Sequence, residues 1–121
     1  PSRIEKLVGQ GSKVFCGCDF LNFFALVNGA TGLFTGSGNV APAQIRQLYD
    51  LVKSSEYGKA EKVWKKLQPI SRLLWTLPFN PVAKAGSDRT GRKVGPCRMP
   101  GPPLKEHELK LVDEAVAALS A

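Results

Sequence analysis

The sequence has no run of apolar residues as long as a membrane-spanning helix, and it holds one histidine and three cysteines among 121 residues. A helix needs about 20 consecutive apolar residues to cross a bilayer, so no membrane-spanning segment is expected. The start of the chain also lacks the basic-then-apolar pattern of a secretory signal peptide. With 43% hydrophobic residues, however, the chain has the composition of one small globular unit.

The single histidine and the placement of the acidic residues exclude two classes of hydrolase. His107 lies between Glu106 and Glu108 in a predicted last helix, where we expect it to face solvent. A Ser-His-Asp triad therefore has no base near a predicted strand end. A pair of catalytic carboxylates is also missing, because Asp19 is the only acidic residue that follows a predicted strand.

The cysteines, Cys16, Cys18 and Cys97, are an odd number, so a disulfide framework is not expected. Their scarcity is typical of a reducing compartment, and we predict a cytoplasmic protein. Cys16 and Cys18 would point to one face of a strand, but only the distant His107 could join them as a metal ligand. We therefore interpret them as small buried thiols and predict no metal site.

The charge is strongly basic, with 17 Lys and Arg against 10 Asp and Glu and a formal net charge of +7. Such a balance raises the expectation of a polyanionic partner, and a small basic nucleic-acid-binding protein is one alternative. The lysines between residues 59 and 66 lie on an amphipathic helix that also carries Glu56 and Glu61. No aromatic residues are interleaved to stack bases, so a solvated helix face is the favoured explanation.

The chain begins with Pro1 rather than methionine, inside a pattern that is already helical. We expect it to be part of a longer chain. Residues 13–18 and 31–36 read as two short strands, and each leads through a glycine-containing loop into a helix, at 20–28 and from Pro42. Two strand-loop-helix units in succession predict a parallel α/β protein.

The rest of the sequence is predicted to be mainly helical. Helices follow Pro42 and the joint at 54–58, a kink or break is expected at Pro69, and a loop is expected at 77–81. Residues 82–90 are at best weakly helical, residues 95–103 form an extended connection, and a last helix covers about 105–119. The two tryptophans, Trp64 and Trp75, are predicted to be core residues.

The glycine-rich segment from Gly32 to Pro42 is the most informative part of the sequence. A loop of this kind before a helix can place a small anionic group against backbone N–H groups. Gly36-x-Gly38-x-x-Ala41 formally matches the dinucleotide fingerprint, but no acidic residue closes a following strand. A phosphate-binding Gly-Lys-Ser/Thr motif is also absent, so no cofactor is predicted.

Several motifs in order resemble the dihydrodipicolinate synthase / N-acetylneuraminate lyase family over essentially the whole chain. They are Gly17-Cys18-Asp19, Asn28-Gly29-Ala30-x-Gly32, Asn39-Val40-Ala41-Pro42, Asn80-Pro81, Gly95-Pro96-x-Arg98-x-Pro100 and Pro102-Pro103-Leu104. The resemblance implies a (β/α)8 barrel followed by three helices, assembled as a homotetramer. Residues 1–54 would hold the last two βα units of the barrel, and 55–121 the C-terminal helical bundle.

The family's chemistry implies a class I aldolase, lyase or dehydratase that acts on pyruvate or a related 2-oxo acid. The resemblance places the Schiff-base lysine on the sixth strand, so this chain would hold no catalytic residue and be inactive alone. Lys84 lies after the barrel and is interpreted as structural. A barrel relative without catalytic activity remains an alternative.

The resemblance also implies substrate-binding positions, carried over residue by residue. Gly17 and Asp19 would lie at the rim of the pocket, with Cys18 in place of the family's first acid. The others are Phe34, whose carbonyl would face the pyruvoyl group, Gly36, where the lyase branch has a serine, and Asn80.

Overall fold

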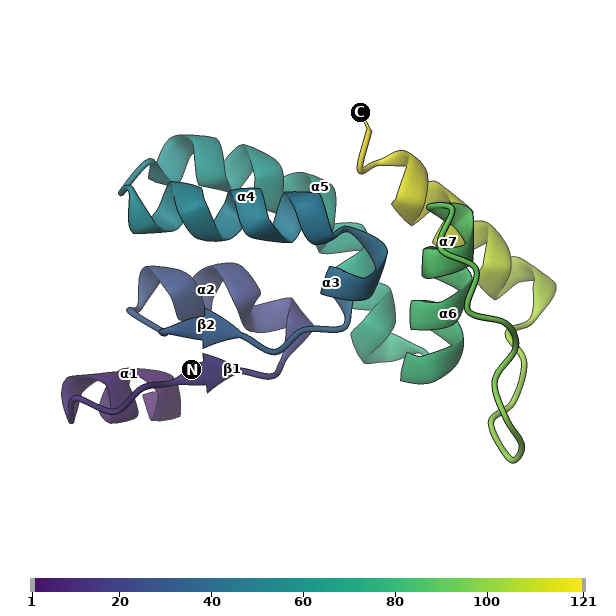
Figure 1. Ribbon diagram of the computed structural model, residues 1–121, viewed down its shortest axis with the longest axis horizontal. Coiled ribbons are helices and arrows are strands. Elements are labelled where there is room, and N and C mark those ends of the chain that lie inside the picture. Colours follow the sequence, from purple (N-terminus) through teal and green to yellow (C-terminus); the bar gives the residue numbers. More distant parts are fainter. Residues whose placement is uncertain (1, 121) are drawn as a thin grey trace.

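Two short strands pair in parallel, as the sequence predicts, and every other element of the fold is helical (Figure 1). The structure is a computed structural model that describes residues 2–120. β1 (Phe15–Cys16) and β2 (Gly32–Leu33) pair in the register Phe15↔Gly32 and Cys16↔Leu33. Both strands lie inside the predicted ranges but are shorter, because a ladder extends only over residues that face a partner.

The helices around the strands end where the sequence signals predict. α1 (Ser2–Gly9) precedes β1, and the first crossover consists of the 3-10 turn η1 (Asp19–Leu21) and α2 (Asn22–Val27). Gly29 ends this crossover with a φ of +87°, a conformation that glycine adopts without strain. α2 lies between the strand pair and α4 (Figure 1).

After β2 the chain forms a short helix, α3 (Ser37–Val40), and then α4 (Pro42–Lys53) and α5 (Tyr57–Thr76). Pro42 occupies the first turn of α4, where its missing N–H has no partner to lose. Of the kink or break expected at Pro69, the break is absent, because α5 continues through this residue to Thr76. Burial of the neighbouring Leu67 and Ile70, both 0% exposed, offsets the lost backbone hydrogen bond.

The preceding helix ends at Thr76, as expected, but the loop expected at 77–81 covers only residues 77–78. The weak helix expected at 82–90 is wrong, because α6 (Phe79–Arg89) is continuous. Pro81 stands in its first turn, where backbone N–H groups have no intrahelical acceptor. Gly86 and Ser87 do not interrupt the helix. The Ser87 hydroxyl donates to the carbonyl of Ala83, at 2.8 Å, one turn earlier in α6.

The proline-rich segment between α6 and α7 (Glu106–Ala117) has no helix or strand, as predicted. α7 confirms the last predicted helix, and His107 is exposed on it. Arg89 of α6 forms an ion pair with Asp113 of α7, so the two helices are joined by charge as well as by packing.

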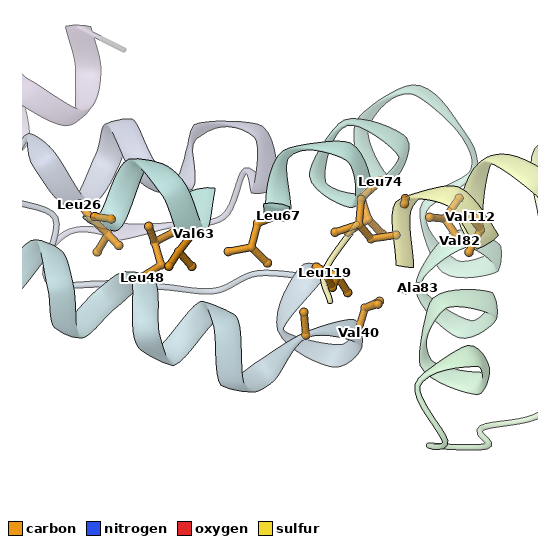
Figure 2. Packing of buried hydrophobic residues seen from close by; sticks show 14 of the residues in the cluster. Leu26, Val40, Leu48, Val63, Leu67, Leu74, Val82, Ala83, Val112 and Leu119 are labelled. Carbon is orange, nitrogen blue, oxygen red and sulfur yellow. The ribbon is translucent and has the colours of Figure 1, made fainter. Parts of the chain in front are cut away.

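One hydrophobic core runs through the helical part of the molecule (Figure 2). It includes Leu48 of α4, Leu67 of α5, Val82 of α6 and Val112 of α7, each 0% exposed. This cluster includes residues on both sides of residue 54. A smaller cluster of Cys16, Ala25 and Ala30 packs against Ile4 of α1 and Leu33 of β2.

The tryptophans differ in burial. Trp64 packs against the core and stacks on Phe23, with ring centroids 6.3 Å apart. Trp75 is 69% exposed, so its predicted place in the core is wrong. It lies on the outer side of α5, where the helical stripe of buried residues does not extend. None of the helices described between residues 2 and 120 has the length and apolar character that a bilayer span requires.

Candidate functional site

The loops that follow β1 and β2 meet at one edge of the strand pair, because both strands run in the same direction. They surround an open hollow of about 570 Å³. Its lining comprises Gly17, Asp19, Leu33, Phe34, Thr35, Gly36, Asn39 and Phe79. Four of the five predicted substrate-binding residues are therefore brought together here.

Asn80, the fifth predicted position, does not line this hollow. It lies on a separate hollow beside α6, together with Lys84 and Arg98. The residue before it in the sequence, Phe79, takes part in the first hollow instead. The start of α6 thus contributes an aromatic ring to the loops that follow the strands.

Asp19 is buried, 6% exposed, and its carboxylate binds backbone groups of the second loop. Its Oδ1 accepts the N–H of Ser37 at 2.6 Å, and its Oδ2 accepts the N–H of Gly36 at 3.0 Å. The Thr35 hydroxyl donates a further hydrogen bond to Oδ1. Charge-assisted bonds of this kind are among the stronger ones in proteins, so Asp19 ties the end of β1 to the end of β2.

This arrangement also bears on the anion site suggested by the glycine-rich loop. The N–H groups of Gly36 and Ser37 at the start of α3 already point at a negative group. That group is the side chain of Asp19, which belongs to the chain itself. The loop's donors therefore serve an internal contact between the two strand ends.

A polar network that the sequence analysis missed supports this contact. The Asn22 amide, 0% exposed, donates to Thr35 Oγ1 at 2.8 Å and to Ser37 Oγ at 3.4 Å. Its Oδ1 is buried without a hydrogen-bond partner. An asparagine inside the apolar run 20–27 was the available signal, because a buried amide needs polar partners.

Phe79 packs directly on Gly36. A Cβ atom on Gly36 would lie 2.4 and 2.6 Å from atoms of the Phe79 ring, well inside contact distance. The φ of Gly36 is −70°, an ordinary value for any residue. Space for the ring, and not backbone conformation, is therefore the reason that a glycine fits here.

The other residues singled out in the sequence have structural surroundings. Cys16 is buried and its thiol lies 3.5 Å from the carbonyl of Cys18. Over residues 2–120, no cluster of three or more His, Cys, Asp or Glu side chains is placed to hold a metal ion. Lys84 donates to the carbonyl of Val94 at 3.2 Å, so its ammonium group fixes the loop after α6.

This chain is an α/β protein, because its parallel strands lead through polar loops into helices. Its fold matches part of TIM-barrel enzymes of known structure. The dihydrodipicolinate synthase of Thermotoga maritima superposes with a TM-score of 0.88 over 98% of this chain, at 24% identity. That of Bacillus anthracis superposes with a TM-score of 0.78 over 86% of the chain, at 25% identity. The chain covers 42% and 36% of those two structures.

The sequence matches the dihydrodipicolinate synthetase family over residues 2–119, and the chain belongs to that family. It is 33% identical to the 4-hydroxy-tetrahydrodipicolinate synthase of Limosilactobacillus reuteri over 104 residues, which cover 86% of the chain. It is 32% identical to that of Bartonella tribocorum over 130 residues, covering 96% of the chain. The matched regions span 34% and 42% of these two relatives.

Proposed function

We propose that this chain is the C-terminal part of a Schiff-base-forming aldolase, lyase or dehydratase that acts on pyruvate or a related 2-oxo acid. The observation that carries the proposal is the hollow at the carboxyl ends of β1 and β2, lined by Gly17, Asp19, Phe34 and Gly36. In (β/α)8 barrels the active site is built from the loops that follow the strands. Membership of the family supplies the class of reaction.

In this proposal β1 and β2 are the seventh and eighth strands of a barrel. Residues 1–54 form its last two βα units, and residues 55–121 form the C-terminal helical bundle. An apolar groove beside β2 supports this placement. Its lining includes the apolar side chains of Phe15, Leu33 and Ile45. Phe15 is 62% exposed, as expected of a surface that further strands and helices cover.

The covalent step belongs to a lysine on the sixth strand, outside this chain. Its amine adds to the ketone carbon of the 2-oxo acid, and loss of water leaves an iminium ion that accepts electrons from the adjacent carbon. Gly17, Asp19, Phe34 and Gly36 shape the pocket around that carbon. Asn80 follows Phe79, which lines the same pocket, in the sequence. The active assembly is a homotetramer of complete barrels in a cytoplasmic setting, without a cofactor.

Two ion pairs made by lysines in the first half of α5 do not favour the alternative of nucleic-acid binding. Lys59 pairs with Glu56, and Lys65 pairs with Glu61 at 2.8 Å. Both pairs are exposed, so they belong to the mixed, solvated helix face that the sequence indicates.

Borohydride trapping tests the proposal. The chain is fused behind the N-terminal part of the Limosilactobacillus reuteri synthase to complete a barrel, and pyruvate and borohydride are added. Hydride reduces the iminium carbon to a stable secondary amine, which mass spectrometry locates. We expect an adduct on the completed barrel and none on the 121 residues alone. A Lys84→Arg variant should trap pyruvate equally well, because Lys84 binds loop carbonyls.

Absence of an adduct on a folded, completed barrel would overturn the proposal. An adduct on the isolated chain would show that the nucleophile lies within residues 1–121. Loss of the adduct from the completed barrel in the Lys84→Arg variant would show the same.

A further inference from the structure

The part of the hollow that this chain builds presents two phenylalanines, loop backbone and the neutral polar residues Thr35 and Asn39, and no free charge. Among its eight lining residues, Asp19 alone carries an ionisable side chain. Both oxygens of that carboxylate accept hydrogen bonds from the Thr35–Ser37 segment. The charge is therefore compensated from within the chain and directed at the loop backbone.

Two phenylalanines line the same hollow. Phe34 is 84% exposed and Phe79 is 45% exposed, and both line the hollow. On one side the ring of Phe79 lies against the backbone of Gly36, where no side chain intervenes. Large exposed rings at a concave surface offer apolar contact area to a ligand.

The neighbouring hollow shows the contrast. Its lining includes Lys84 and Arg98 as well as Asn80, so cationic groups are present nearby but belong to a different surface. A ligand carboxylate placed against the Phe34–Phe79 wall would lose hydration without gaining an ion pair from these residues. An aryl or alkyl group would lose little and gain contact with the rings.

We propose that Phe79 is a specificity-determining residue, and that the wall of Phe34 and Phe79 selects an aldehyde partner with an uncharged aryl or alkyl group. This inference rests on the proposed function, because it concerns the second substrate of that site. The 2-oxo acid occupies the position next to the lysine. The apolar group of the partner lies against the ring of Phe79.

Ligand binding that needs no Schiff base tests this selection. Saturation-transfer NMR on the completed barrel compares 4-fluorobenzyl alcohol with 4-hydroxybutyrate, an aryl probe and a carboxylate probe that do not react with amines. We expect the aryl probe to bind about tenfold more tightly. Phe79→Ser and Phe79→Leu should each reduce that preference, to about twofold in Phe79→Ser.

Trp75→Ala is the matched control, because it removes an exposed aromatic ring that does not line the hollow. It should keep the full aryl preference. Equal or tighter binding of 4-hydroxybutyrate, or an unchanged preference in both Phe79 variants, would overturn the inference. Aryl preference without pyruvate trapping would contradict the proposed function alone, and trapping without aryl preference would contradict this inference alone.

Discussion

The carboxylate of Asp19 accepts the backbone N–H of Ser37 at 2.6 Å, so a side chain at the end of one strand fixes the backbone at the end of the next. The two residues are 18 positions apart in the sequence. Their contact joins the two loops that line the candidate site. Asp19 is thus as much a positioning residue for the second loop as a group at the pocket rim.

Replacement of Asp19 by asparagine tests this role. An amide has one acceptor oxygen, and its NH2 group would face a backbone N–H, so one of the buried donors of Gly36 or Ser37 loses its acceptor. We expect the free energy of unfolding to fall by about 1–3 kcal/mol, measured by equilibrium urea unfolding. Asp50→Asn is the control, because Asp50 is exposed and pairs only with Arg46 at the surface of α4. Equal effects of the two substitutions would contradict the assigned role.

Gly86→Ala tests the contact between α3 and α6. A Cβ atom at position 86 would lie 2.8 and 3.0 Å from the two methyl groups of Val40. We expect a loss of stability of about 1–3 kcal/mol from overpacking, although alanine is the better helix former. Thermal and urea unfolding measure the change.

Two further variants make this test specific. Gly58→Ala, in α5 with nothing within 4 Å of the new Cβ, should leave stability unchanged or raise it by up to about 1 kcal/mol. If the clash causes the loss, the double variant Gly86→Ala/Val40→Ala should lose less stability than the two single variants lose in sum. A loss equal to or larger than that sum would reject the explanation.

Gly36→Ala should move the ring of Phe79 without unfolding the chain. The new methyl group overlaps the ring, and the ring is half-exposed and free to turn toward solvent. We expect a small stability change, below about 1 kcal/mol, and a clear shift in the aromatic NMR signals of Phe79. The aryl preference of the hollow should fall as it does in Phe79→Ser. Unchanged Phe79 signals would show that the ring does not occupy the space above Gly36.

The surface of α5 offers a test by titration. A hydrogen bond from Lys65, together with its charge, lowers the pKa of Glu61 below its ordinary value of 4.5. The pKa of Glu61 is lower in the folded state than in the unfolded state. The pair's contribution to stability is therefore complete above the unfolded-state pKa and is lost as the pH falls through the folded-state pKa. In Lys65→Met the pKa of Glu61 should return toward 4.5, as read from carboxyl carbon NMR shifts. Lys66→Met should leave it lowered, and a shift of equal size there would contradict the pairing.

Local sequence signals were sufficient for the parallel α/β core. Glycine-rich loops after short apolar runs predicted both strands, and the spacing of apolar residues predicted α4, α5 and α7. The order of the motifs also indicated the family. These features repeat with a helical or strand period, or stand next to each other in the chain, so they can be read without coordinates.

The remaining features depend on contacts between distant residues. Pro81 and Gly86 suggested a broken helix, but packing of Gly86 on Val40 accommodates a continuous α6. The bonds between Asp19 and the Gly36–Ser37 backbone leave no periodic trace in the sequence. The place of Phe79 at the hollow was missed for the same reason, because only the fold brings it over Gly36.

In the part of the chain that the structure describes, β1 and β2 form a sheet of two strands and no more. Each strand therefore leaves one row of peptide groups facing outward, and such rows template pairing between molecules. A preparation of these 121 residues by themselves should consequently show concentration-dependent self-association, which dilution would relieve. Its behaviour in purification thus depends on backbone groups that substitutions other than to proline leave in place.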